Sequence, residues 1–572
     1  MKKKWNKELH LRKVIMEEKF SIEMNKDEML RYYENKIVED GIKSCSEFNT
    51  IVNLTDYNTK EIKLEKYKNE ILQLLYRDER VADVVIDDEF NVLATGSYDW
   101  ENKLVEGYWT YSIDDIWHGL QSAYKSLNDE CENKFSSKIT SLSAIGFSAM
   151  MHGYLAFDKD DNLLVPFRTW RNTTTAQAAR ELTRVFNFNI PQRWSIAHLY
   201  QAILNNEEHV KDISYITTLA GYVHYKLTGK KALGIGDASG MFPIDSDIND
   251  YNQEMLEKFS NLENVKQFDW NIKDILPKVL LAGENAGTLS EDGAKLLDPS
   301  ATLKAGALMC PAEGDAGTGM VATNSVAQRT GNISAGTSIF SMIVLEKQLS
   351  RVYEEIDMVT TPTGKPVAMV HCNNCCTDLD YWVKLFIEFS SLSGNNLTKG
   401  EIYDLLYNEA LKGDSDCGKI VSINYFSGEP VTGFLQGRPM LLRSENSNFN
   451  LANFMRTHIY SAIATLKIGM EILEEENVNI DKLMGHGGLF KTKYVGQKLM
   501  AGAMKTPVSV LSTAGEGGAW GIAVLASYAK NNFGLPLEEF LDKKVFSKYE
   551  ISTVQPDIND VNGFEKYIGH QE

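Results

Sequence analysis

The chain has 572 residues, of which 43% are apolar and 24% charged, and its formal net charge is −19 at pH 7. A single hydrophobic core stops growing at roughly 250 to 300 residues, so this length predicts two large domains. The acidic balance excludes a protein that wraps nucleic acid, and the lack of an apolar run of about 18 to 20 residues argues against a membrane protein.

The first third of the sequence changes character near residue 82. Residues 1–65 are rich in Lys, Glu, Asn and Tyr and predict an appended, mostly helical arm, with an amphipathic stretch at 24–38. Residues 82–96 then read as strand, tight turn and strand, and a helical pattern follows from 112 to 124. Further predictions are a strand at 139–151 that opens into His152-Gly153, and helices at 175–188, 196–205 and 215–227, the last ended by Gly229.

The second half repeats this mixture of strands and helices. Its predicted elements are strands at 329–333, 338–345, 367–371 and 508–511, a long helix at 451–475 and a small-residue helix at 517–528. We therefore expect an α/β protein with domains at 66–303 and 304–572, preceded by the arm at 1–65.

The seven cysteines are scattered, apart from one cluster formed by Cys372, Cys375 and Cys376. An odd number without paired spacing is not typical of a disulfide framework, so we expect a reducing, cytoplasmic environment. His371 gives the cluster a metal-like spacing, and structural zinc is an alternative. No second paired motif completes four ligands, so we predict no structural metal.

Gly336-Thr337-Ser338 joins two apolar strands by a small polar turn. Glycine allows backbone N–H groups to approach an anion, and the two hydroxyls add donors, which favours a phosphate-binding turn. The alternative is a plain hairpin, because such turns favour these residues on backbone grounds alone.

Three other glycine-rich turns carry candidate chemistry. In Glu313-Gly314-Asp315-Ala316-Gly317, Asp315 addresses magnesium through water or simply begins a helix. Gly487-Gly488 follows an apolar strand and leaves room for an adenine ring, or is an ordinary loop. Asp237 lies in Gly236-Asp237-Ala238-Ser239-Gly240, where it is a general base or an Asx-turn residue.

Together with Met151-His152-Gly153, these motifs in this order resemble the FGGY family of carbohydrate kinases, in particular its xylulokinase-like members, within the actin-like ATPase superfamily. The resemblance runs from about Val84 to the end of the chain. It implies an α/β fold of two ribonuclease H-like domains with a central interdomain cleft, with ATP as co-substrate and Mg²⁺ as cofactor. The implied partners are a small-molecule sugar and ATP, with no nucleic acid and no membrane, and a homodimer is compatible with it.

The resemblance also implies roles for individual residues. Asp237 corresponds to the general base that takes the proton from the sugar hydroxyl. Trp170 lies in a segment that borders the sugar, although Arg171-Asn172 replaces a pair that usually ends in Asp, and a core role for Trp170 is the alternative. The implied sugar-binding residues are Met151, His152, Trp170 and Arg171, and the implied nucleotide-binding residues are Asp315, Gly336, Thr337, Ser338, Gly487 and Gly488.

One departure concerns the first phosphate hairpin of the family. The corresponding segment, 73–82, has no glycine and no hydroxyl, with Arg77 in place of glycine and Leu75 at a carboxylate position. Two functions follow: an active kinase for a ketose such as xylulose or a related pentulose or polyol, or a non-catalytic sugar- or nucleotide-binding protein on the same fold. A third interpretation, an actin-like filament or chaperone ATPase, is disfavoured by Met151-His152 and Trp170.

Overall fold

The computed structural model describes residues 79–395, 397–432, 437–511 and 517–571. The predicted arm at 1–65 and most of the degenerate segment, residues 73–78, lie outside the described residues. The last four residues of that segment, 79–82, belong to the first strand.

Contacts divide the chain into two compact units. The small unit includes Asp99–Asp115, and the large unit consists of Ala82–Tyr98 and Ile116–Glu572. In the small unit, β3 (Lys103–Val105) and β4 (Tyr108–Thr110) form an antiparallel hairpin, and the rings of Trp100 and Tyr111 stack at 4.2 Å.

The first elements of the described residues are the predicted hairpin of β1 (Glu79–Ile86) and β2 (Val92–Trp100). Its turn is fixed by the Asp87 carboxylate, which accepts the backbone N–H groups of Glu89 at 2.9 Å and Asn91 at 2.8 Å. The next elements, up to residue 322, are α5 (Ile113–Phe135), β5 (Ala144–Ile145), β6 (Ser148–Ala149), β7 (Leu155–Phe157), α6 (Ala176–Phe186), α7 (Ser195–Leu204), β8 (Tyr215–Thr217), α8 (Leu219–Thr228), β9 (Ala232–Gly234), α9 (Ile235–Ala238), β10 (Ile244–Asp245), β11 (Asp250–Tyr251), α10 (Gln253–Ser260), α11 (Ile272–Ile275), β12 (Lys278–Leu280), α12 (Glu291–Leu297), β13 (Leu308–Met309), β14 (Glu313–Gly314) and α13 (Asp315–Ala322).

Two predictions in this half need correction. The strand expected at 139–151 is two short strands, β5 and β6, which pair in parallel with β13 and β14 and are separated at Gly146-Phe147. The helix expected at 215–227 begins only at Leu219, because residues 215–217 form β8 and pair with β7. Thr218 caps the helix by accepting the N–H of Gly221, and Gly229 ends it with φ +70°, as predicted.

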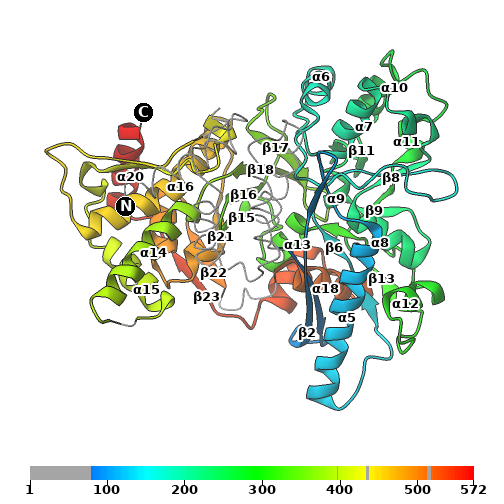
Figure 1. The fold of residues 1–572 in the computed structure, drawn as a ribbon, viewed down its shortest axis with the longest axis horizontal. Helices are drawn as coiled ribbons and strands as arrows, with labels where there is room; N and C mark the ends of the chain where they lie inside the picture. The colour runs from blue at the N-terminus through cyan, green and yellow to red at the C-terminus, as the bar shows by residue number, and fades with distance from the viewer. Residues whose placement is uncertain (1–78, 396, 433–436, 512–516, 572) are drawn as a thin grey trace, which may run out of the picture. The chain divides into compact units, whose positions relative to one another are not determined.

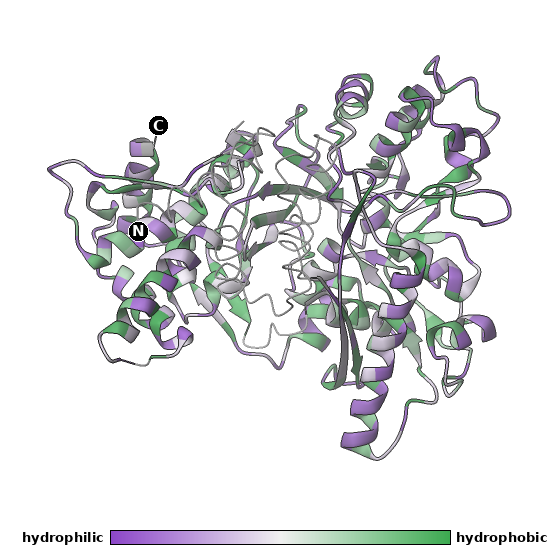
Figure 2. Ribbon diagram, viewed as in Figure 1, coloured by the Kyte–Doolittle hydropathy of each residue, from purple (hydrophilic) through white to green (hydrophobic). Residues whose placement is uncertain are grey.

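The second half is built on a seven-stranded mixed sheet with the strand order β17-β18-β16-β15-β21-β22-β23. Its strands are β15 (Thr330–Ala335), β16 (Ile339–Val344), β17 (Ile356–Thr360), β18 (Pro366–Cys372), β21 (Lys482–His486), β22 (Val508–Leu511) and β23 (Ile551–Val554). The other elements are α14 (Cys376–Leu392), α15 (Lys399–Ala410), β19 (Val421–Ile423), β20 (Met440–Leu442), α16 (Leu451–Glu475), α17 (Val495–Met504), α18 (Gly517–Lys530), α19 (Leu537–Phe540) and α20 (Ile558–Gln571). Figures 1 and 2 show that the strands of this sheet are predominantly hydrophobic.

Helix α16 is the centre of the second core. It spans Leu451–Glu475 as predicted, is buried over most of its length and packs on α14, α15, α17 and β18 (Figure 1). The approach to β18 is close, because a Cβ added at Gly469 would lie 2.2 Å from Cγ1 of Val370. A helix that is apolar around most of its circumference is expected in such a buried position.

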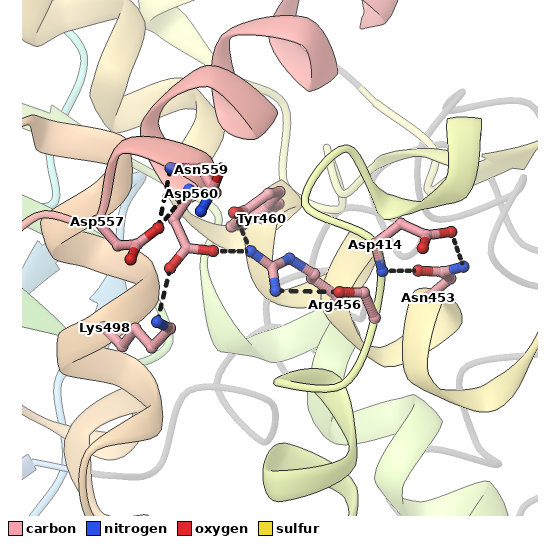
Figure 3. A network of polar contacts seen from close by, with 9 residues as sticks. Asp414, Asn453, Arg456, Tyr460, Lys498, Asp557, Asn559 and Asp560 are labelled. Atoms are coloured by element: carbon pink, nitrogen blue, oxygen red, sulfur yellow. Dashed lines mark hydrogen bonds and ion pairs between the residues drawn. The ribbon is translucent and has the colours of Figure 1, made fainter.

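A buried ion-pair network ties the last helix to this core (Figure 3). Arg456 on α16, which is 2% exposed, donates to the carboxylate of Asp560 on α20 and to the Tyr460 hydroxyl at 2.8 Å. Lys498 on α17 lies 3.1 Å from the same carboxylate. Because removing one partner would leave a buried charge uncompensated, this network fixes α20 against α16 and α17.

Candidate active site

Three carboxylates gather where β9, β14 and α13 meet. Asp237 lies in the short helix α9, Glu313 in β14, and Asp315 is the first residue of α13. The Glu313 carboxylate accepts the backbone N–H groups of Gly236 at 3.3 Å and Asp237 at 3.0 Å. Glycine is required beside it, since a Cβ at Gly234 or Gly236 would lie 2.3 or 2.4 Å from a Glu313 oxygen.

The electrostatics of the cluster disfavour full ionisation. Burial raises the pKa of Glu313 to about 8, although its backbone hydrogen bonds oppose the shift. Asp237 has no exposed surface, and its pKa is well above the usual range because of burial and, to a smaller extent, the charges of Glu313 and Asp315. The Thr218 hydroxyl donates to Asp237 Oδ2 at 2.6 Å, whereas Oδ1 has no partner among the described residues. The cluster is therefore suited to accept a proton or to face a cation.

Asp315 is the accessible member of the cluster. Asp315 is exposed to solvent. Its Oδ1 accepts the backbone N–H of Met151 at 3.1 Å and that of Ala316 at 3.0 Å. Surrounding protein still raises its pKa by desolvation, and these hydrogen bonds oppose that effect. A carboxylate with this combination of access and orientation has the properties of a general base.

The structure brings Met151 and His152 to this cluster. Met151 is buried, and a Cβ at Gly314 would lie 2.2 Å from its Cγ, so its side chain covers the peptide between Glu313 and Asp315. His152 has φ +70°, and its Nδ1 lies 3.1 Å from the carbonyl oxygen of Gly240. Because a carbonyl oxygen only accepts, Nδ1 carries the proton and Nε2 is left as the acceptor. Burial, and then the charge of Arg193, hold the pKa of His152 well below its usual range, so the ring is neutral.

Trp170 and Arg171 lie on the segment next to this loop. The backbones of Tyr154 and Arg168 are paired, with the N–H of Tyr154 donating at 2.8 Å, so the chain reaches Trp170 two residues beyond this bridge. The Trp170 side chain is partly exposed, and the Arg171 guanidinium lies over its ring at 5.3 Å. Trp170 is therefore a surface residue beside the loop rather than the core residue of the alternative interpretation.

The predicted nucleotide-binding residues form a second group. The turn Gly336-Thr337-Ser338 follows β15, and Thr337 is exposed. The first residues of α14 hold this turn, because the N–H of Cys376 donates to the Gly336 carbonyl and that of Cys375 to the Thr337 carbonyl, both at 3.0 Å.

Gly487 and Gly488 lie beside the same turn. They follow β21, which pairs in parallel with β15, so both glycine-rich segments leave the sheet at the carboxyl ends of neighbouring strands. Gly487 has φ +99°, and a Cβ there would lie 2.4 Å from the Ala335 carbonyl oxygen, immediately before the turn. The carboxyl edge of parallel strands is where α/β proteins bind nucleotides. Backbone N–H groups and the open position at Gly336 suit the approach of phosphate.

Arg193 is a site residue that the sequence analysis missed. Its guanidinium forms an ion pair with Asp357 on β17, and its carbonyl accepts the N–H of Gly153 at 3.1 Å. Burial raises the pKa values of Asp315 and Asp357, and the positive charge of Arg193 opposes that shift. Burial lowers the pKa values of His152 and His371, and the same charge adds to that shift. Arg193 thus places a cation among the groups of the site, and its position before a helix gives no motif from which this could be recognised.

The strand that holds Asp357 also contacts α9. The backbone N–H of Thr360 donates to Ser239 Oγ at 3.1 Å, and the Thr360 hydroxyl donates to the carbonyl of Ile235 at 3.1 Å. Residues of the second half of the chain therefore support the helix that carries Asp237. Glu313 and Thr218 were also missed as site residues. The glycines at 234 and 236 are the sequence signal that the Glu313 side chain requires space there.

The cysteine cluster has no metal-binding geometry. Cys372, Cys375 and Cys376 are buried, and the sulfur atoms of the last two are 3.6 Å apart. Within the described ranges, no three or more His, Cys, Asp or Glu side chains are arranged to hold a metal ion. In the same part of the chain, no helix has the length and apolar character required to cross a bilayer.

Comparisons with known proteins show which family the chain resembles. The models of the FGGY family of carbohydrate kinases match twice, the N-terminal domain over residues 80–303 and the C-terminal domain over 331–530. A xylulose kinase from Haemophilus influenzae is 24% identical over 477 residues, which are 80% of this chain and 89% of the relative. The crystal structure of a xylulose kinase from Bifidobacterium adolescentis has a TM-score of 0.66 at 17% identity, covering 86% of this chain and 97% of that one. Gluconate kinase from Lactobacillus acidophilus has a TM-score of 0.69 at 15% identity, covering 86% and 94%.

Proposed function

The chain belongs to the FGGY family of carbohydrate kinases, and on this premise we propose that it transfers the γ-phosphoryl group of ATP to a hydroxyl of a ketose such as xylulose, or of a related pentulose or polyol. The predicted two-domain actin-like ATPase fold is confirmed by the family and structural matches. Kinases of this family use ATP as co-substrate. The xylulose kinase from Haemophilus influenzae supports the choice of a pentulose, and we place the boundary between the two domains near residue 304.

The observation that carries the proposal is the carboxylate cluster with one accessible member. Asp237 is the predicted general base, and this role stays a prediction; its side chain has no exposed surface in the described conformation. A general base has to lie within hydrogen-bonding distance of the proton that it takes. We propose Asp315, which is exposed, as the proton acceptor in this conformation, and Asp237, whose Oδ1 lies close to Gly314, remains the predicted alternative.

The sugar is expected to lie against the loop formed by Met151 and His152. The free Nε2 of His152 accepts a hydrogen bond from a sugar hydroxyl, and Trp170 offers an aromatic face to sugar C–H groups, with Arg171 beside it. The neutral state of His152 suits this role, because a neutral ring has an acceptor that a protonated ring lacks.

The nucleotide is expected at the second group. Gly336, Thr337 and Ser338 supply N–H and hydroxyl donors to the phosphates, and Gly487-Gly488 leave space beside them for the base. The unpartnered Oδ1 of Asp237 is an oxygen acceptor that fits Mg²⁺; Asp237 and Asp315 would hold that ion through water, and it would neutralise charge on the phosphates.

Phosphoryl transfer depends mainly on in-line positioning and on neutralisation of charge. With the sugar hydroxyl at Asp315, the oxygen attacks the γ-phosphorus, its proton passes to the carboxylate, and ADP leaves. Arg193 supplies a positive charge close to Asp315, and we propose that it stabilises the transferring group. The alternative of a non-catalytic protein depends on segment 73–82, most of which lies outside the described residues.

A coupled ADP-release assay over pentuloses, hexuloses and polyols tests the proposal. We expect turnover with at least one pentulose, and a fall of about 10²- to 10⁴-fold in kcat for Asp315→Asn, as typical for loss of a general base. Calorimetric binding of the sugar is the control, since the variant should still bind it. Sugar binding without ADP release by the unmodified protein would refute catalysis and favour the non-catalytic alternative.

A further inference from the structure

Two adjacent cysteines at the start of helix α14 have no part in the proposed reaction. Cys375 is the N-cap residue of the helix and Cys376 is its first residue, and their sulfur atoms lie 3.6 Å apart. Both side chains are free thiols, with exposed fractions of 1% and 8%, respectively. Consecutive residues within a helix do not face each other, so it is the entry of the chain into α14 that brings these two sulfur atoms together.

The peptide unit between the two cysteines supports the predicted phosphate-binding turn. The N–H of Cys376 belongs to this unit and donates to the Gly336 carbonyl at 3.0 Å. The carbonyl of Cys375 belongs to it as well and accepts the side-chain amide of Asn424 at 3.2 Å. The N–H of Cys375 adds a bond to the Thr337 carbonyl at 3.0 Å. The residues that carry the two thiols therefore also hold the turn.

A disulfide between these residues would act directly on that peptide unit. The two sulfur atoms would have to approach each other by about 1.6 Å, and the bond would enclose the peptide unit in a small ring. The Cα atoms of consecutive residues are only about 3.8 Å apart, whereas those of disulfide-bonded residues usually lie about 4.4 to 6.8 Å apart. Closure therefore requires the peptide unit to rotate or bend, which moves the N–H of Cys376 away from the Gly336 carbonyl.

The surroundings of the pair favour a bond that forms slowly and is easily reversed. The hydrogen bond with the Cys376 thiol, and then burial, raise the pKa of Cys375 well above its usual range. A protonated thiol is a weak nucleophile, so the reduced pair is stable when little oxidant is present. Strained disulfides are readily reduced, and for that reason they are typical of regulatory rather than structural bonds.

We propose that Cys375 and Cys376 form a thiol-modification site that a low-molecular-weight disulfide oxidises, and that the resulting bond releases the predicted phosphate-binding turn from the start of α14. Cys376, the more exposed of the two, attacks a sulfur atom of glutathione disulfide as the thiolate and expels one glutathione thiolate. Cys375 then attacks the sulfur of Cys376 and expels the second glutathione. The two cysteines lose two electrons and two protons, which reduce glutathione disulfide to two glutathione molecules. The effect on nucleotide binding rests on the proposed function, whereas the chemistry of the pair does not.

Peptide mass spectrometry of the full chain after incubation with glutathione disulfide tests the site. We expect a bond between Cys375 and Cys376, seen as the loss of two hydrogen atoms, and dithiothreitol should restore both thiols. Cys375→Ser should retain glutathione on Cys376, because the second step is then impossible. The matched control is Cys372→Ser, which removes the third cysteine of the cluster and should still form the bond. A product that joins Cys372 to either neighbour, or the absence of any intramolecular bond, would overturn the proposal.

Amide hydrogen exchange of the oxidised protein tests the effect on the turn without any ligand. The N–H groups of Cys375 and Cys376 are protected by their bonds to the turn. Oxidation should therefore raise their exchange rates by about 10-fold or more, as expected for the loss of a backbone hydrogen bond. Cys375→Ser, treated in the same way, should show no such change. Exchange rates that disulfide formation leaves unaltered would contradict the proposed release.

Calorimetric titration of ATP separates this inference from the proposed function. If the turn binds phosphate, oxidation should raise the Kd for ATP by about 10-fold or more, and dithiothreitol should restore it. Faster amide exchange in a protein that binds ATP equally well in both forms would support the modification site and refute nucleotide binding by this turn.

Discussion

Gly236→Ala tests how closely Glu313 is held against α9. The new Cβ would lie 2.4 Å from Glu313 Oε2, whereas ordinary contacts begin at 3.4 Å. Overpacking of this kind costs about 1 to 3 kcal/mol, and displacement of Glu313 from two buried N–H groups costs a further 1 to 3 kcal/mol. The helix propensity of alanine offsets about 1 kcal/mol. We therefore expect a loss of about 2 to 4 kcal/mol in the free energy of unfolding.

The matched control is Gly319→Ala on α13, because no atom lies within 4 Å of the added Cβ and φ is not positive. This substitution should raise stability by about 0.5 to 1 kcal/mol, because the glycine lies within a helix. The assays are urea unfolding and ADP release. In Gly236→Ala the shift of α9 also moves Asp237, so kcat/KM should fall about 100-fold. If both variants unfold at the same urea concentration and both retain turnover, Glu313 is not the rigid buried group described above.

Three other features can each be tested by substitution. The pKa of Glu313 is about 4.5 in the unfolded chain and about 8 in the folded one, so between these pH values only the native state keeps the proton. The free energy of unfolding therefore falls as pH rises from about 5 to 8, by at most about 1.4 kcal/mol per pH unit. Glu313→Gln should flatten this part of a series of urea-unfolding measurements, and an unchanged slope would contradict the assignment. Asp560→Ala should lower the free energy of unfolding by about 3 to 5 kcal/mol, because the buried Arg456 then lacks its carboxylate partner. The double variant Arg456→Met/Asp560→Leu should lose less stability, since it leaves no uncompensated charge. Equal losses of stability in the two variants would argue against uncompensated charge as the cause. Arg193→Ala should lower kcat about 10- to 100-fold with little change in the KM for sugar, and a raised KM at constant kcat would instead make it a residue for ground-state binding.

The sequence predicted correctly those helices and strands whose hydrophobic pattern lies entirely within their own residues. The helix at 451–475 and the strand at 508–511 have the predicted bounds, because their apolar residues are buried over most of their length. Errors occurred where pairing partners are distant along the chain. Residues 215–217 are a strand because β7, about 60 residues earlier, pairs with them, and no local pattern contains that information.

For the candidate site, the sequence shows which contiguous motifs exist, and the roles of their residues stay predictions. Turns such as Gly336-Thr337-Ser338 are contiguous, so their chemistry is readable, and the structure places them beside Gly487-Gly488. Burial is not readable in this way. Asp237 and Asp315 have similar glycine-rich contexts, and only the fold makes one inaccessible and the other exposed. Arg193 was missed for the same reason, since its neighbours come from β17 and from the loop at Gly153.

Helix α14 connects the predicted phosphate-binding turn to the second core. The N–H groups at its start hold the carbonyl groups of Gly336 and Thr337, and its inner side packs Leu379 and Val383 into that core. A nucleotide that changes the position of this turn would act on the helix through two backbone hydrogen bonds. Because a ligand that binds only the folded state stabilises it, a nucleotide bound at this turn should raise the free energy of unfolding of the core in which α14 packs. Urea unfolding at increasing ATP concentrations would measure this coupling.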